Sequence, residues 1–174
     1  FLIRYISYKK YSFMIVETEH TPNPDTLKFL PGKKVSEAGP IEFLKNDKDI
    51  KITLVKKILS LNGTLMVFLG NDFITVKKEK DLNWENLKHG IISEINDYYS
   101  KGNNVVVKKD PKLEKIQNNF STNTQETKPD NVVNKIKDVL DTKVRPAVAK
   151  DGGDITFKSF KDGVVTVELK GSCS

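Results

Sequence analysis

The sequence predicts an α+β protein with two small mixed α/β domains joined by a flexible linker, the C-terminal one incomplete. Three observations indicate this: short β-like runs alternate with helical stripes in residues 14–101, the same mixture recurs in 130–174, and a polar segment at 102–129 separates them. Of the 174 residues, 37% are hydrophobic and 30% charged, a globular composition with a polar surplus. No apolar run approaches the roughly 18 residues of a membrane-spanning helix, so we expect no membrane contact.

Residues 1–13 are expected to be a non-native or unstructured extension. They contain no acidic residue and precede Met14, which is the expected start of translation. A transit peptide is also basic and poor in acidic residues, but it is usually richer in Arg and Ser.

The first half of the N-terminal unit is expected to hold two strands and a helix. The strands lie at residues 15–18 and 27–30, on either side of a loop that Pro22 and Pro24 keep out of helical conformation. Asp49 is the predicted helix cap, and Asn62-Gly63 ends the helix. Its apolar residues recur at helical spacing: Ile52, Val55, Ile58, Leu59 and Leu61.

The second half is expected to hold a hairpin and a longer helix. Runs at 65–69 and 73–76 flank Gly70-Asn71-Asp72, which predicts the hairpin. Asn83 caps the helix, Trp84 is a core anchor at its start, and Gly102 ends it. The helix presents one apolar stripe: Leu87, Ile91, Ile92, Ile95 and Tyr98.

Residues 102–129 are expected to be a disordered linker. Lys, Asn, Gln, Thr and Glu dominate, and Val105-Val106-Val107 is the only apolar block. Such a linker leaves two domains free to reorient.

The C-terminal unit is predicted to start with a helix capped by Asp130, interrupted or kinked by Pro146 and ended by Gly152-Gly153. Its stripe contains Val132, Val133, Ile136, Val139 and Leu140. Alternating strands follow, one through Ile155 and Phe157 and one through Val165, Val167 and Leu169, joined by a turn at Lys161-Asp162-Gly163. One helix and two strands bury too little to be stable alone, so at least one further helix is expected downstream.

Charge and cysteine content limit the partners and the cell compartment that we expect for this chain. The net charge is +6, but only Arg4 and Arg145 are arginines. Nucleic-acid readers rely on the arginine fork, so we interpret the lysines as solvated surface and consider a nucleic-acid partner unlikely. The single cysteine, Cys173, permits no intrachain disulfide and fits a reducing compartment. A bacterial cytoplasm is expected, with the mitochondrial matrix as the alternative.

No catalytic set can be assembled, and we expect no enzyme. The sequence contains neither a Ser–His–Asp or Cys–His arrangement nor a phosphate-binding glycine loop. His20 and His89 are expected at the surface. Asp151 and Asp154 are expected to be turn and cap residues, and Arg145 is expected to pair with one of them.

Two stretches resemble the Nfu family, also called NifU-like scaffold proteins. Residues 18–32, from Thr-Glu-His-Thr-Pro-Asn-Pro to Pro-Gly, resemble the opening of the family's N-terminal domain, and residues 68–76 resemble a later strand pair. Residues 144–154 (Val-Arg-Pro-Ala-Val-Ala-Lys-Asp-Gly-Gly-Asp), the hairpin and Gly171-Ser172-Cys173 resemble the NifU-type C-terminal domain.

The resemblance implies that Cys173 is a metal and cofactor ligand. In the family it is the first cysteine of a Cys-x-x-Cys pair, whose second member would lie two residues beyond Ser174. The implied cofactor is a [4Fe–4S] cluster, or a [2Fe–2S] cluster. Gly171 lets the backbone turn tightly and leaves room for backbone N–H groups to point toward sulfur. The hydroxyls of Ser172 and Ser174 are expected to point toward sulfur in the same way.

Counting thiolates extends this expectation. A cubane cluster needs four, and a Cys-x-x-Cys pair supplies two, so two chains must share the cluster as a homodimer. The implied role is a scaffold or carrier that receives a cluster from upstream assembly proteins and passes it to apo iron–sulfur proteins. A thiol–disulfide redox protein and an interaction adaptor without a cluster are the alternatives.

Overall fold

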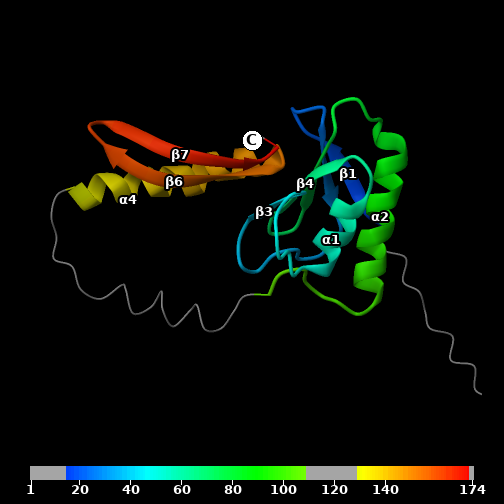
Figure 1. The fold of residues 1–174 in the computed structure, drawn as a ribbon. Coiled ribbons are helices and arrows are strands. Elements are labelled where there is room, and N and C mark those ends of the chain that lie inside the picture. Colours follow the sequence, from blue (N-terminus) through cyan, green and yellow to red (C-terminus); the bar gives the residue numbers. More distant parts are fainter. Residues whose placement is uncertain (1–14, 109–128, 173–174) are drawn as a thin grey trace, which may run out of the picture.

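The structure, a computed structural model, describes residues 15–108 and 129–172 (Figure 1). It confirms the α+β class, with a five-stranded sheet and two helices in the first range and a helical segment with a two-stranded hairpin in the second. The expectations for residues 1–13, for most of the linker and for Cys173 lie outside the described residues. In the two described ranges, no helix has the length and apolarity needed to cross a bilayer.

The N-terminal sheet is antiparallel, with the strand order β1-β2-β5-β4-β3. Its strands are β1 Glu17–His20, β2 Thr26–Leu30, β3 Ile41–Leu44, β4 Thr64–Leu69 and β5 Ile74–Lys78. The predicted hairpin is confirmed as β4 and β5, and the two N-terminal strands as β1 and β2. Sequence reasoning missed β3, whose Ile41-Glu42-Phe43 alternation is short and pairs with β4 at the edge of the sheet.

The two faces of this sheet have different coverings, because alternate strand residues point to opposite sides. Helices α1 (Thr53–Ser60) and α2 (Trp84–Ser100) pack on one face and on each other (Figure 1). The core between them and the sheet is aliphatic with one phenylalanine and includes Leu27, Phe29, Leu54, Ile58, Val67, Leu69, Ile74, Val76, Ile91 and Ile95. Met66, Phe68 and Phe73 form a second cluster, and Met66 and Phe68 alternate with core residues along β4.

The two helix caps have different outcomes. Asn83 is confirmed as the cap of α2, because its side chain accepts a hydrogen bond from the Glu85 N–H at 3.2 Å. The cap predicted at Asp49 is wrong: α1 begins at Thr53 behind Ile52, which makes no side-chain cap bond. Asp49 instead has a φ of 64°, a left-handed conformation, and lies in the loop before the helix.

The N-terminal unit extends past the boundary expected at residue 101. Val105 and Val106 are buried, and the N–H groups of Val106 and Val107 both donate to the Val35 carbonyl, at 2.9 and 3.0 Å. Val107 also forms a parallel bridge with Ser36. The start of the expected linker is therefore an ordered edge of the first unit, because its valines complete the core.

The C-terminal unit is a helical segment beside a hairpin. The segment consists of α4 (Pro129–Val139), the π-helical turn η1 (Leu140–Val144) and α5 (Arg145–Lys150), and the hairpin of β6 (Gly153–Lys161) and β7 (Val164–Gly171). The cap predicted at Asp130 is wrong, because the helix already begins at Pro129, and proline suits a first turn. The end predicted at Gly152 is confirmed: α5 stops at Lys150, and Gly152 has a φ of 81°.

Pro146 changes the helix type instead of breaking the segment. The Arg145 N–H donates to the Leu140 carbonyl, five residues back, as in a π-helix. Pro146 then lies in the first turn of α5. Backbone N–H groups in a first turn have no partner within the helix, so the N–H that proline lacks is not needed there.

The hairpin has one apolar face that is covered on one strand only. Its register pairs Ile155 with Leu169, Phe157 with Val167 and Phe160 with Val165, which places all six on one side. The segments α5 and η1 pack against β6. On β7, Val165, Val167 and Leu169 remain 38%, 37% and 43% exposed.

Candidate functional site

The end of the hairpin that precedes the predicted ligand lies at the junction of the two units. In Figure 1 the turn between β6 and β7 points away from the N-terminal sheet, and the other end of the hairpin adjoins it. Cys173 lies outside the described residues, but Gly171 and Ser172, which precede it, are described and buried. No group of three or more His, Cys, Asp or Glu side chains placed to hold a metal ion occurs among the described residues.

Three glycines form the base of the hairpin. Gly153 pairs with Gly171, and the Ser172 N–H donates to the Gly152 carbonyl at 3.3 Å. Gly152 and Gly171 have φ values of 81° and 80°. A Cβ on Gly171 would lie 2.7 Å from the Gly152 carbonyl oxygen and 2.9 Å from the Gly153 Cα, so only glycine fits here.

Polar groups of the N-terminal sheet hold this base. The Gly171 N–H donates to Glu42 Oε2 at 2.7 Å, and Thr75 Oγ1 donates to the Gly152 carbonyl at 2.8 Å. Thr26 Oγ1 donates to Ser172 Oγ at 3.1 Å. The Gly171 N–H and the Ser172 hydroxyl, expected near the cluster sulfur, are thus bonded to N-terminal side chains.

The loop before β2 adds to this contact. Asn23 Nδ2 lies 3.4 Å from the Ser172 carbonyl oxygen, and the Thr21 hydroxyl contacts the Thr26 hydroxyl. Sequence reasoning gave none of these roles, because nothing in the sequence indicates that the Pro22-Asn23-Pro24 loop meets the hairpin base.

Arg145 fixes the helical segment to the start of β6. Its Nε lies 2.9 Å from Asp154 Oδ1, its Nη1 lies 2.6 Å from Asp141 Oδ1, and its Nη2 donates to the Ile155 carbonyl at 3.0 Å. The predicted pairing is therefore confirmed for Asp154, which is buried, while Asp151 is the C-cap of α5. These bonds set the geometry of the Gly152-Gly153 turn.

The side chains of the remaining singled-out residues take no part in the bonds described above. His20 and His89 are exposed, as expected. Trp84 packs at the edge of the core, with its ring 6.5 Å from that of Phe29 and its indole N–H donating to the Pro24 carbonyl at 3.0 Å.

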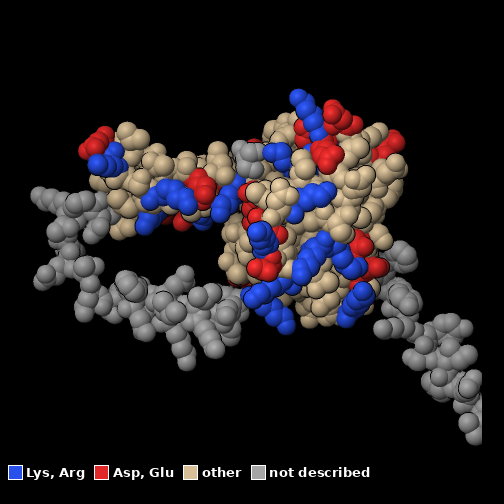
Figure 2. Space-filling model, in the orientation of Figure 1, with Lys and Arg blue, Asp and Glu red and all other residues tan. Residues whose placement is uncertain are grey.

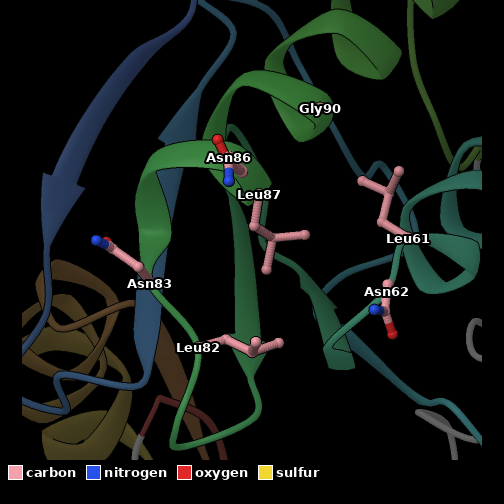
Figure 3. Close-up of a pocket in the computed structure, with 7 residues that line it drawn as sticks. All are labelled: Leu61, Asn62, Leu82, Asn83, Asn86, Leu87 and Gly90. Carbon is pink, nitrogen blue, oxygen red and sulfur yellow. The ribbon is translucent and has the colours of Figure 1, made fainter.

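A pocket of about 340 Å³ lies between the end of α1 and the start of α2 (Figure 3). Leu61 and Leu87 point toward each other across it, and three asparagine side chains lie around it. Its lining consists of Leu61, Asn62, Leu82, Asn83, Asn86, Leu87 and Gly90. This set contains no nucleophile, acid or base, so the pocket offers no catalytic group.

Charge does not mark a separate site on the face shown in Figure 2. Basic and acidic side chains lie close together on both units there. Several are paired in the structure, including Lys28 with Glu19 at 3.0 Å and Lys78 with Asp25 at 2.8 Å.

Two family models match the chain. "Scaffold protein Nfu/NifU N terminal" matches residues 16–102, and "NifU-like domain" matches residues 136–174. A human protein named "NFU1 iron-sulfur cluster scaffold homolog, mitochondrial" is 38% identical over 168 residues, which cover 96% of this chain and 63% of that protein. The Arabidopsis thaliana "NifU-like protein 4, mitochondrial" is 37% identical over 163 residues, which cover 92% of this chain and 56% of that protein.

The chain therefore spans somewhat more than half the length of these curated relatives. Among solved structures, a NifU-like protein from Saccharomyces cerevisiae is 22% identical with a TM-score of 0.51. The match covers 63% of this chain and 95% of that one, and it shows a likeness of fold.

The expected bacterial cytoplasmic location is wrong. Both curated relatives carry "mitochondrial" in their names, one from an animal and one from a plant. A single cysteine indicates a reducing environment but does not distinguish a bacterial cytoplasm from a mitochondrial compartment, which is why sequence reasoning chose wrongly.

Proposed function

The chain belongs to the Nfu/NifU family, and we propose on this basis that it is a scaffold in iron–sulfur cluster assembly rather than an enzyme. The observation that carries the proposal is the NifU-like match over residues 136–174, which includes the only thiol of the sequence. The hairpin geometry supports it, since β7 ends at Gly171, directly before the Ser172-Cys173 step.

Cys173 is the proposed ligand, and its thiolate is the donor that iron–sulfur clusters require. One chain of this family offers two such thiolates at most, so the cluster is shared between two chains as a homodimer. A [4Fe–4S] cluster fills its coordination in this way, and a [2Fe–2S] cluster has the same need for four thiolates.

The cluster is cargo in this proposal. A cluster held between two chains by short loops is accessible to incoming thiolates, which replace its ligands one at a time. The chain then receives clusters from upstream assembly proteins and delivers them to apo iron–sulfur proteins. The names of the curated relatives support a mitochondrial location for this activity.

Anaerobic reconstitution of the full-length protein with ferrous iron and sulfide tests the proposal. We expect a brown protein with thiolate-to-iron charge-transfer absorption, eluting as a dimer in size-exclusion chromatography. Cys173→Ser should give a colourless monomer, because an alcohol does not replace a thiolate at iron. His89→Asn is the matched control and should load normally, since His89 is exposed and remote from the hairpin base.

Other outcomes favour the alternatives. Equal spectra for the wild type and Cys173→Ser would reject Cys173 as a ligand. Reduction of insulin without metal would support a thiol–disulfide redox protein. An adaptor without a cluster is the second candidate, favoured by the close contact that the N-terminal sheet makes with another folded unit. It predicts that the reconstituted protein holds no cluster and passes none to an apo-acceptor.

A further inference from the structure

The sheet face opposite α1 and α2 carries a row of side chains that continues across three strands. Glu42 of β3 pairs with Phe68 of β4, and Phe68 pairs with Thr75 of β5. Directly paired residues lie on the same side of a sheet, so these three form one row, called here the docking row. Phe68 and Thr75 are fully buried, although no helix of the N-terminal unit covers this face.

The base of the C-terminal hairpin is what covers the docking row. A Cβ on Gly152 would lie 2.8 Å from Thr75 Oγ1, and a Cβ on Gly171 would lie 3.2 Å from Phe68 Cγ. Ala149 also packs on the Met66–Phe68–Phe73 cluster. The two glycines therefore let the backbone of one unit lie directly on the side chains of the other.

Each end of the docking row makes a directional bond to the hairpin base. Glu42 accepts from the Gly171 N–H at 2.7 Å, a charge-assisted bond, and Thr75 donates to the Gly152 carbonyl at 2.8 Å. Thr26, on the same face, donates to Ser172. Buried polar groups that lose such partners carry a free-energy penalty, so this arrangement selects one docked orientation.

We propose, resting on the function proposed above, that the docking row is an intramolecular site for the thiol-bearing end of the C-terminal unit and holds the chain in a closed, autoinhibited state. The Cα of Cys173 follows that of Ser172 at about 3.8 Å, the spacing of adjacent residues, so it starts at this contact. Ser172, which precedes Cys173, is 4% exposed at this contact, so a second chain that shares a cluster through Cys173 has to approach an end of the hairpin that the N-terminal sheet covers. Undocking must therefore precede the cluster-bridged dimer.

Because Cys173 is the only thiol, its alkylation by a bulky maleimide reports directly on docking. The test variant, Glu42→Gln/Thr75→Val, weakens both bonds of the row without changing side-chain size. We expect its thiol to react at least about tenfold faster than that of the wild type, because the variant loses the Thr75 hydrogen bond and the charge that strengthens the Glu42 bond. Its radius of gyration from small-angle X-ray scattering should also be larger.

Thr64→Val is the matched control. Thr64 is buried at the start of β4, four residues before Phe68, and its hydroxyl has no hydrogen-bond partner, so its removal should leave alkylation and scattering unchanged. Circular dichroism checks that every variant is folded. If the double variant unfolds, Glu42→Gln alone is used, because Glu42 lies on the edge strand and is half-buried.

Alkylation and scattering need no iron, so they separate this inference from the proposed function. Equal alkylation rates and equal radii for the wild type and the folded variant would overturn the closed state, whatever the result of reconstitution. Faster alkylation of Cys173 in a variant that never binds a cluster would support docking and reject the scaffold role. Faster cluster loading of the variant would support both.

Discussion

Two adjacent tyrosines at the end of α2 fasten it to the loops around it. The Tyr98 hydroxyl donates to the Val105 carbonyl and the Tyr99 hydroxyl to the Lys34 carbonyl, both at 3.1 Å. Burial raises the pKa of both hydroxyls, and that of Tyr99 rises to about 12, with a smaller contribution from Tyr98. Both phenols therefore stay protonated in the folded chain at a pH where they ionise in the unfolded chain.

This shift predicts a loss of stability at high pH. Between the unfolded pKa of about 10 and the folded pKa of Tyr99, the folded state binds more protons than the unfolded state, so the free energy of unfolding falls as pH rises. The contribution is fully present below pH 10 and is lost as the pH rises toward 12. Urea unfolding of the wild type and Tyr99→Phe at pH 8, 10 and 11 measures it.

Tyr99→Phe should be less stable than the wild type at pH 8, because the Lys34 carbonyl loses its hydrogen-bond partner. Its free energy of unfolding should fall less steeply between pH 8 and pH 11. Parallel declines for the two proteins would show that Tyr99 does not cause the alkaline loss. Tyr98→Phe serves as the comparison, since the hydroxyl of Tyr98 is less buried.

At the residue scale, the sequence predicted local roles well and long-range roles poorly. The Asn83 cap and the Arg145–Asp154 pair were predictable because the partners lie within ten residues of each other. Glu42 and Thr75 were not, because each meets a glycine far along the chain that the packing of the two units brings to it. Asp49 was mistaken for a cap because Asp serves helix starts and left-handed turns equally well.

At the scale of elements, the hairpin of the C-terminal unit depends on its two-residue turn. Asp162 and Gly163 have φ values of 52° and 80°, the type I′ combination that matches the strand twist. A Cβ on Gly163 would meet nothing within 4 Å, so any effect of a substitution there acts through the backbone alone.

Gly163→Ala should therefore destabilise the hairpin by about 1 kcal/mol, the usual penalty of the left-handed region for a residue with a Cβ. Faster amide hydrogen exchange along β6 and β7 would report it. Asp162→Asn is the control and should have little effect, because Asn accepts a positive φ at least as well as Asp. Unchanged exchange in Gly163→Ala would mean that the turn is not the type I′ form described.

Strand and helix periodicities predicted most elements, and the failures have physical causes. The strand β3 has four residues, too few for a period-2 pattern to stand out. Pro146 was expected to interrupt or kink the helical segment. The segment instead continues through a π turn that precedes Pro146, and the sequence pattern does not distinguish these outcomes. Val105 to Val107 were assigned to the linker because a three-residue apolar block gives no periodicity.

At the scale of the whole molecule, the two units bury their surfaces unequally. The N-terminal sheet is covered on one face by helices and on the other by the hairpin base. The apolar face of β7 remains partly open at Val165, Val167 and Leu169. Adjacent apolar side chains on a strand form a contiguous surface, which binds apolar dyes and promotes self-association.

We therefore expect this chain to bind the dye ANS and to self-associate weakly as its concentration rises. Val165→Thr/Val167→Thr should reduce both, because Thr keeps the shape and strand preference of Val but replaces a methyl group with a hydroxyl. Val164→Thr is the matched control: Val164 is more exposed, at 63%, but adjoins the turn and points to the opposite side from Val165. Dye fluorescence and sedimentation velocity measure the effect, and equal reductions in the two variants would mean that general hydrophobicity, rather than this face, drives association.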